Sequence, residues 1–231
     1  MKSTLLLVAS AAALVQASAL VPRQSHVESL CGLYAYWSND NYELLNNLWG
    51  KDTATSGSQC TYLDGTSGGG IQWSSTWTWN GAPDNVKSYP YAGRKVAKGR
   101  KISDVTRMPT AVTWKYDRTD IRANVAELMI WLARYGGIYP IGTLFGQVQL
   151  AGRTWDLYTG YNGKMRVYSF LPPSGDIRDF SCDVKDFYNY LEKTHAFPAK
   201  EQNIIVYQIG TEAFTGGPAT FTVTKFTADL S

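Results

Sequence analysis

Two glutamates stand in unlike surroundings in this chain. Glu127 lies in the run Ala-Glu-Leu-Met-Ile-Trp-Leu, and Glu212 lies in Gln-Ile-Gly-Thr-Glu-Ala-Phe-Thr-Gly. A carboxylate in an otherwise apolar run loses hydration on burial, so it tends to carry a raised pKa, a partner or a catalytic task. Retaining hydrolysis of a glycosidic bond needs one carboxylate as nucleophile and one carboxylic acid as proton donor, about 5 to 5.5 Å apart. The pair therefore indicates glycosidase chemistry, provided that the fold brings both side chains together.

Composition argues against several other classes of function. The formal net charge is +3, which is too weak to indicate a nucleic-acid partner when no basic stripe accompanies it. Two His and three Cys form no ligand pattern, so we expect no zinc site. The 15 Tyr and 8 Trp supply flat apolar faces that suit either core packing or sugar rings.

The N-terminus has the pattern of a secretory signal peptide. Lys2 precedes an apolar stretch from Leu5 to Val15, and small residues follow up to Ala19. We therefore exclude residues 1–19 from the fold and expect a secreted, extracellular protein without a membrane span. Residues 20–30 are expected to form a short leader, and residues 31–231 a single domain, because this length suits one larger all-β domain.

Cysteine usage agrees with secretion. Cys31 and Cys60 can close a loop of about 30 residues and stabilise the fold by a few kcal/mol through restriction of the unfolded state. Cys182 is then left over. We interpret it as an ordinary thiol near the start of a helix, because only His26 and His195 could partner it and neither lies in a recognisable motif.

The elements that must position the glutamates are mostly short strands. Residues 71–79 alternate, with Trp73, Trp77 and Trp79 on one face, which predicts a strand whose tryptophan side packs in a sandwich core. Further strands are predicted at 112–116, 146–150, 154–160, 165–170, 204–209 and 219–226. Turn signals such as Asp64-Gly65 separate them. This pattern favours an all-β sandwich or jelly roll over an α/β fold.

One helix is predicted over residues 183–194, where apolar residues recur at helical spacing after a capping-type Ser181 or Asp183. Residues 126–135 are ambiguous, because their Ala, Glu, Leu, Met and Arg favour a helix by propensity alone. The resemblance described next favours a strand there.

Several short motifs match one known family in chain order. They are 46–50 (Asn-Asn-Leu-Trp-Gly), 58–60 (Ser-Gln-Cys), 86–89 (Val-Lys-Ser-Tyr), 127–132 (Glu-Leu-Met-Ile-Trp-Leu), 183–187, 189–191 and 210–212 (Gly-Thr-Glu). In these residues the chain resembles glycoside hydrolase family 12, especially secreted fungal endo-β-1,4-glucanases. The resemblance implies a jelly roll of two curved antiparallel sheets with one short helix, whose concave sheet forms an open cleft for a β-glucan. It also implies a monomer that needs no metal or organic cofactor.

The resemblance implies a role for each glutamate. Glu127 corresponds to the nucleophile that attacks the anomeric carbon. Glu212 corresponds to the general acid/base, which protonates the leaving oxygen and then activates water, so that configuration is retained.

Four further residues correspond to the sugar-binding cleft of the family. Asn47 and Trp49 are similar to residues that line the sugar site beside the nucleophile. Met129 lies two positions from Glu127 and hence on the same face of a strand. Tyr34 is similar in place to an aromatic residue that stacks on a glucosyl ring.

The chain departs from the family immediately before Glu127. In the family, the strand similar to residues 121–126 continues with Tyr-Asp and a loop before the nucleophile strand begins, whereas here Glu127 follows Ala126 directly. The family Asp that hydrogen-bonds the nucleophile has no match, and Asp117 and Asp120 are poor substitutes on register grounds. Residues 125–128 also lack the Gly, Asn or Pro that usually makes a turn, so we expect a strand to be displaced or lost.

Three hypotheses follow. The first is an active endoglucanase on cellulose-type or mixed-linkage glucan, favoured over a xyloglucan-specific enzyme because Gly-Thr-Glu after Tyr207-Gln208-Ile209 is closer to the glucanase branch. The second is a catalytically impaired homologue that binds glucan or interacts with a plant inhibitor. The third is that coding sequence was lost at a wrongly assigned splice site before Glu127.

Overall fold

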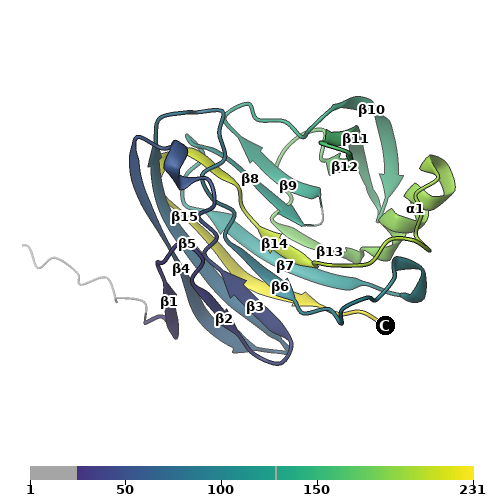
Figure 1. Ribbon diagram of the computed structural model, residues 1–231, viewed down its shortest axis with the longest axis horizontal. Helices are drawn as coiled ribbons and strands as arrows, with labels where there is room; N and C mark the ends of the chain where they lie inside the picture. Colours follow the sequence, from purple (N-terminus) through teal and green to yellow (C-terminus); the bar gives the residue numbers. More distant parts are fainter. Residues whose placement is uncertain (1–24, 128) are drawn as a thin grey trace, which may run out of the picture.

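Residues 25–127 and 129–231 are described by a computed structural model, except for the side chains of Ala126 and Glu127. The predicted signal peptide, residues 1–19, lies outside the described residues. Two β-sheets pack face to face, and a single α-helix lies beside β10, β11 and β12 at one end of the molecule (Figure 1). Within the described ranges, no helix has the length and apolar character that a bilayer crossing requires.

The first sheet, sheet A, is antiparallel throughout. In spatial order its strands are β1 (Glu28–Leu30), β4 (Ser56–Ser67), β5 (Gly70–Asn80), β15 (Ala213–Ala228), β7 (Pro109–Tyr116) and β13 (Asp179–Asp183). Residues 28–30 fall within the stretch expected as a leader and pair with β4 as strand β1. The disulfide predicted between Cys31 and Cys60 is confirmed and joins the end of this segment to β4.

The second sheet, sheet B, contains both glutamate segments. In spatial order its strands are β2 (Tyr36–Ser38), β3 (Tyr42–Leu45), β6 (Tyr91–Arg94), β14 (Gln208–Gly210), β8 (Arg122–Glu127), β9 (Ile130–Tyr135), β12 (Met165–Leu171), β11 (Arg153–Asn162) and β10 (Thr143–Leu150). All of its pairings are antiparallel except the short contact between β9 and β12. Two 3-10 turns, Lys51–Thr53 and Ile102–Asp104, complete the regular structure. The predicted jelly-roll sandwich is confirmed.

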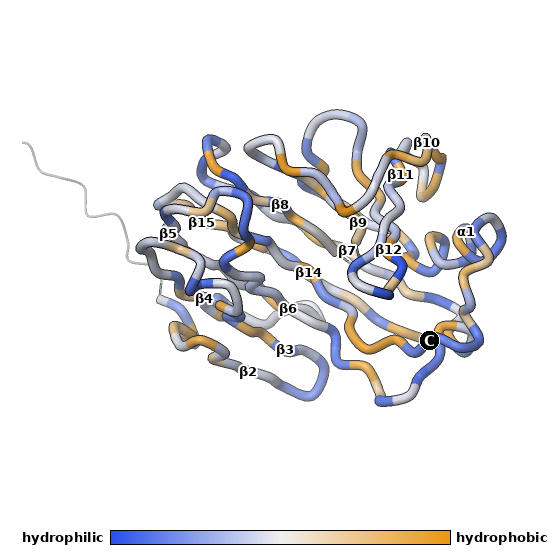
Figure 2. The backbone as a smooth tube through the Cα atoms, turned by 45° about the horizontal axis from the view of Figure 1, so that its top comes forward, coloured by the Kyte–Doolittle hydropathy of each residue, from blue (hydrophilic) through white to orange (hydrophobic). Residues whose placement is uncertain are grey.

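The core lies between the two sheets. Trp73, Trp77 and Trp79 are 0%, 1% and 3% exposed, so the predicted tryptophan stripe of β5 is confirmed as core. Phe221 of β15 packs edge-on against Trp73, with ring centroids 5.3 Å apart. Figure 2 shows hydrophobic segments on strands of both sheets and hydrophilic segments on several connecting turns.

The predicted helix is confirmed as α1 (Lys185–His195). Its Phe187 packs edge-on against Trp155 of β11 and Phe170 of β12. The Asp183 carboxylate accepts the first N–H of the helix, that of Lys185, at 3.1 Å. Because the buried face of α1 meets β11 and β12, it supports the far end of sheet B.

The predicted strand at 204–209 is largely wrong. Only Gln208–Gly210 pairs as a strand, and residues 204–207 are irregular. The apolar run misled because Ile205 and Val206 are exposed (85% and 40%) rather than buried on alternate sides. Tyr207 is buried instead, and its hydroxyl donates to the Met108 carbonyl at 3.0 Å.

The chain reverses direction directly after Glu127. The backbone of Glu127 pairs with that of Ile130, so β8 and β9 form a hairpin closed by two residues. Met129 lies in this turn with φ +61°, a left-handed conformation that is uncommon for residues other than glycine. Because β8 and β9 both pair in sheet B, neither segment is lost from the sheet, and displacement of a strand relative to the family stays a prediction. The expectation that Met129 lies on a strand with Glu127 is wrong, because Met129 lies in the turn after β8.

Candidate active site

Glu212 lies in a short gap between β14 and β15, which both pair with β8. Gly210 at the end of β14 pairs with Ala126, and Ala213 at the start of β15 pairs with Ala123, both on β8. Between them the regular ladder is interrupted, and Asn124 bridges the gap. Its backbone N–H donates to the Glu212 carbonyl at 3.1 Å, and its side-chain Oδ1 accepts the Glu212 N–H at 2.9 Å.

The carboxyl group of Glu212 is held by the same residue. The Nδ2 of Asn124 donates to Glu212 Oε2 at 2.5 Å. Burial raises the pKa of Glu212 above its ordinary value, and the hydrogen bond from Asn124 opposes this shift with a smaller effect. A carboxyl group that keeps its proton to higher pH is suited to act as a general acid.

Asn124 is anchored from the core by a chain of hydrogen bonds. The Thr211 hydroxyl donates to the Asn124 carbonyl, and it contacts the Tyr116 hydroxyl at 2.8 Å. Trp77 Nε1 in turn donates to the Tyr116 hydroxyl at 3.0 Å. All four residues are at most 5% exposed, so the chain leads from the centre of the sandwich to the catalytic candidate.

The segment of Glu127 runs beside that of Glu212. The backbone of Glu127 pairs with Ile209 on β14, three residues before Glu212, as well as with Ile130 on β9. The side chain of Glu127 lies outside the described part of the chain. The fold thus places the backbone of Glu127 beside the segment that leads to Glu212. The hypothesis that the two glutamates form a catalytic pair requires this arrangement of the backbone.

Residues 87–89 connect the segment of the predicted cleft residues Asn47 and Trp49 to the start of β15, directly after Glu212. Asn47 adopts φ +49° and its Nδ2 donates to the Tyr89 carbonyl at 3.0 Å, while the Tyr89 N–H donates back to the Asn47 carbonyl at 3.0 Å. The Lys87 N–H then donates to the Ala213 carbonyl at 2.8 Å. Trp49 is 54% exposed, so its ring is available to a ligand.

Tyr34 lies in a loop attached to the Asn47 segment. The loop lies between Cys31 and β2, where the Leu48 N–H donates to the Leu33 carbonyl at 2.9 Å. Tyr34 is 57% exposed. The structure therefore gathers Tyr34, Asn47 and Trp49 in adjacent segments, whereas Met129 lies in the turn after β8 and is 36% exposed.

Sequence reasoning assigned no role to Lys87, although it matched the motif that contains it. The Lys87 ammonium is buried and donates to the carbonyls of Ala82, Asn85 and Phe214 at 2.7, 2.7 and 3.0 Å. Burial lowers its pKa. Because Phe214 lies on β15, two residues after Glu212, this lysine fixes the loop 82–85 against the strand that follows the acid. A lysine between apolar and polar loop residues carries no signal of such a contact in the sequence.

A tyrosine and carboxylate cluster lies on the outer face of sheet B, on the β2 side of Glu212. Tyr36 of β2 donates to one oxygen of Glu43 at 3.1 Å, and Tyr91 of β6 donates to the other at 3.4 Å. Burial and the neighbouring Glu43 carboxylate raise the pKa of Tyr91 to about 12. Sequence reasoning missed this cluster, because its members are up to 55 residues apart and share no motif.

An arginine and aromatic cluster lies on the other side of Glu212. Arg134 of β9 is directly opposite Asn124 in the sheet register. Its guanidinium lies 4.0 Å from the ring centroid of Tyr139, and it donates to the Tyr139 hydroxyl at 3.1 Å. Tyr139 is 56% exposed. Exposed aromatic rings with hydrogen-bonding groups on both sides of Glu212 give this face the chemistry that suits a sugar chain.

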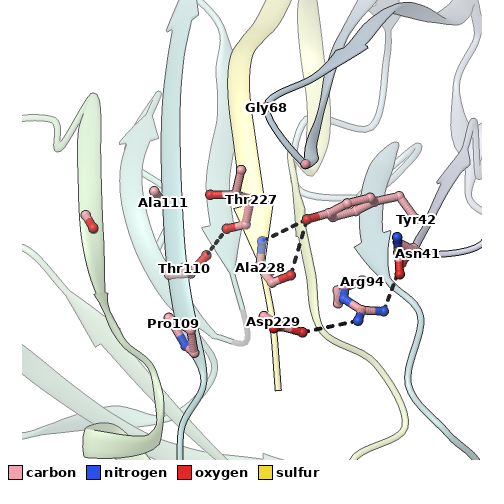
Figure 3. A pocket seen from close by; sticks show the side chains of 12 residues that line it. Asn41, Tyr42, Gly68, Arg94, Pro109, Thr110, Ala111, Thr227, Ala228 and Asp229 are labelled. Atoms are coloured by element: carbon pink, nitrogen blue, oxygen red, sulfur yellow. Dashed lines mark hydrogen bonds and ion pairs between the residues drawn. The ribbon is translucent and has the colours of Figure 1, made fainter. Parts of the chain in front are cut away.

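A separate cavity of about 450 Å³ lies where β3 and β7 begin and where β6 and β15 end (Figure 3). The Tyr42 hydroxyl donates to the Ala228 carbonyl and accepts the Ala228 N–H at its floor. Arg94 pairs with Asp229 at 3.2 Å on its rim. These groups satisfy one another and fasten the C-terminal strand, so we assign the cavity a structural role.

Comparison with known proteins identifies a family to which this chain is similar along most of its length. The family model of Glycosyl hydrolase family 12 matches residues 40–127 and 126–231. Endoglucanase A of Aspergillus kawachii is 40% identical over 226 residues, covering 88% of this chain and 93% of its own. Xyloglucan-specific endo-beta-1,4-glucanase A of Emericella nidulans is 38% identical over 244 residues, covering 98% and 99%.

A solved structure resembles the whole described fold. The catalytic domain of Humicola grisea Cel12A, crystallised with a soaked thio cellotetraose, is 69% identical and superposes with a TM-score of 0.87. The match covers 89% of this chain and 100% of that one. The family model, the sequence relatives and the solved structure agree, and the chain belongs to glycosyl hydrolase family 12.

Proposed function

We propose that this glycoside hydrolase is a secreted, retaining endo-β-1,4-glucanase that acts on cellulose-type or mixed-linkage β-glucan. The observation that carries the proposal is Glu212, a family-motif carboxyl group whose pKa is raised by burial and whose orientation is fixed by Asn124. Support for the substrate comes from the endoglucanase relative and from the cellotetraose analogue bound to Humicola grisea Cel12A. Support for secretion comes from the signal-peptide pattern in the sequence of residues 1–19.

The mechanism uses two carboxylates in two steps. Protonated Glu212 gives its proton to the glycosidic oxygen while Glu127 attacks the anomeric carbon, so the leaving chain departs and a glycosyl ester forms. Glu212, now ionised, removes a proton from water, and the resulting hydroxide displaces Glu127 at the same carbon. Two inversions give net retention, and no cofactor takes part.

The remaining assignments concern binding. Tyr34, Asn47 and Trp49 would hold glucosyl units on the β2 side of the acid, and Met129 would contact the sugar from the turn after β8. The exposed rings of Tyr34 and Trp49 suit stacking on sugar faces. The chain would act as a monomer built from one domain, which includes β1 as well as residues 31–231.

Hydrolysis assays on carboxymethyl cellulose, barley glucan and tamarind xyloglucan test the substrate, and NMR of the first-formed anomer tests retention. We expect the linear glucans to be cleaved faster, with the β-anomer formed first. Glu212→Gln and Glu127→Gln should each abolish turnover of unactivated polymer. Formation of the α-anomer first, or full activity of Glu212→Gln, would overturn the mechanism.

A xyloglucan-specific enzyme is the second candidate, favoured by the length of the match to the Emericella nidulans relative of that name. Faster turnover of tamarind xyloglucan than of barley glucan would establish it in place of the first.

A catalytically impaired glucan-binding homologue is the third candidate. It is favoured by the tight turn that follows Glu127 directly, where the family would have Tyr-Asp and a loop. Glucan binding without hydrolysis, unchanged by Glu127→Gln, would support this candidate. Sequencing the transcript across the codons for Ala126 and Glu127 would show whether the missing segment is genuine.

A further inference from the structure

We propose that Asn124 is a positioning residue that confines the transferable proton of Glu212 to a single oxygen, Oε1. The inference rests on the proposed role of Glu212 as general acid/base. It extends that role by naming the group that decides which carboxyl oxygen performs the proton transfer.

The orientation of the Asn124 amide follows from hydrogen-bond chemistry. A backbone N–H can only donate, so the atom that faces the Glu212 N–H at 2.9 Å must be the acceptor Oδ1. The other end of the amide, Nδ2, is then the atom that faces the carboxyl group at 2.5 Å. Flipping the amide would bring two donors together and two acceptors together, so only one orientation satisfies both contacts.

The location of the proton follows from that orientation. An amide NH₂ has no acceptor capacity, so Glu212 Oε2 must accept from Nδ2 whether the carboxyl group is ionised or protonated. A proton on Oε2 would leave Nδ2 facing a carboxyl hydroxyl oxygen, which is a weaker acceptor than the carbonyl oxygen, so the hydrogen bond favours the proton on the other oxygen. The acid form therefore carries its proton on Oε1, which gives it to the departing glycosidic oxygen as that bond breaks. In the second step Oε1 takes the proton from the attacking water.

Asn124 is itself held in one arrangement. The Thr211 hydroxyl has a single hydrogen, which it donates to the Asn124 carbonyl, so Tyr116 must donate to Thr211. Trp77 Nε1 can only donate, and it donates to Tyr116. The side chain of Asn124 is 1% exposed and makes two hydrogen bonds to Glu212, so rotation would break both without water to replace them.

The test compares leaving groups. Asn124→Leu keeps the size and branching of the side chain but removes the donor and the acceptor. We expect kcat/KM for aryl β-cellobiosides with poor leaving groups, such as phenol, to fall by about 10 to 100-fold, a part of the roughly 100 to 10,000-fold that general acid catalysis contributes. The 2,4-dinitrophenyl substrate leaves without protonation, and its kcat/KM should change by less than about threefold, because only a transition-state interaction with the proton has been lost.

Val125→Ala is the matched control for destabilisation. Val125 is the next residue of β8, is 0% exposed and points into the core. Its truncation should lower the melting temperature without changing the ratio of rates between the two leaving groups. Equal slowing of both substrates by Asn124→Leu, or a ratio that matches the Val125→Ala control, would overturn the proposal.

Two further variants separate the possible failures. Glu212→Ala should show the same or stronger dependence on the leaving group; if it does not, the acid/base assignment itself fails, and this inference with it. If Glu212→Ala shows the dependence and Asn124→Leu does not, only the role of Asn124 is refuted. Should Asn124→Leu fail to fold, Asn124→Ala replaces it, since it removes the donor and the acceptor without placing a second carboxyl group beside Glu212. The same dependence on leaving group is expected at neutral pH.

Discussion

The hydroxyl group of Tyr116 is the best single place to test the buried chain that supports the acid. Tyr116→Phe removes one oxygen atom from a site where the ring is packed against Trp77 and Phe221. The Trp77 N–H then loses its acceptor and Thr211 loses a donor, while both residues remain buried (1% and 0% exposed).

The magnitude follows from these two losses. An unsatisfied buried N–H costs about 1–3 kcal/mol, and a lost hydrogen bond to a hydroxyl that keeps its other partner costs about 0.5–1.5 kcal/mol. Removal of a buried polar oxygen offsets part of this cost, so we expect the free energy of unfolding to fall by roughly 2–3 kcal/mol. For a domain of this size that corresponds to a decrease of about 4–12 °C in melting temperature.

Thermal unfolding followed by circular dichroism or calorimetry measures this change. Tyr188→Phe is the control, because Tyr188 is a partly buried tyrosine, burial raises its pKa to about 12, and its ring packs against Phe197. The control should lower the melting temperature much less. A change in Tyr116→Phe no larger than in the control would refute the reasoning that this hydroxyl links the core to Asn124.

Three other perturbations have defined outcomes. Glu212→Gln should stabilise the protein only above the acid range. Burial raises the pKa of Glu212 above its ordinary value of 4.5, so between the two values the folded wild type binds more protons than its unfolded state, and its free energy of unfolding falls as pH rises through that window. Melting curves of both proteins from pH 3 to 8 test this, and equal gains at all pH values would contradict it. The disulfide Cys31–Cys60 closes a separation of 29 residues, so its reduction should lower the free energy of unfolding by about 3–4 kcal/mol. Denaturant unfolding with and without reductant measures this change, and a loss below about 1 kcal/mol would contradict the prediction. Trp49→Ala should raise KM for cello-oligosaccharides about tenfold, which corresponds to a loss of roughly 1.4 kcal/mol of binding free energy. The melting temperature should not change, because Trp49 is 54% exposed. An unchanged KM would remove Trp49 from the binding site.

Local patterns in the sequence predicted much of the fold. The alternation around Trp73, Trp77 and Trp79 identifies β5 because a half-buried strand has a period of two residues. The apolar spacing around Phe187 identifies α1 because that face packs against β11 and β12. The cysteine pair was readable because a secreted chain favours a short closed loop.

The missed features depend on contacts between distant segments. Asn124 was passed over as one polar residue in an alternating strand, since its contact with Glu212 joins residues 88 positions apart. Ile205 reads as strand by propensity but stays exposed because no neighbour covers it. The turn at Met129 was unexpected because left-handed conformations normally select glycine or asparagine, whereas here pairing of β8 and β9 on either side imposes the reversal.

Strand β15 has a consequence for how the molecule fails. It begins one residue after Glu212 beside β8, and then continues between β5 and β7 as an inner strand of the opposite layer. Unfolding of β15 from its first residues therefore disturbs both layers, so we expect the site and the sandwich to unfold together. Loss of activity on heating and cooperative loss of structure should therefore share one midpoint temperature. Stabilising substitutions in any part of the sandwich should then raise the temperature at which activity is lost.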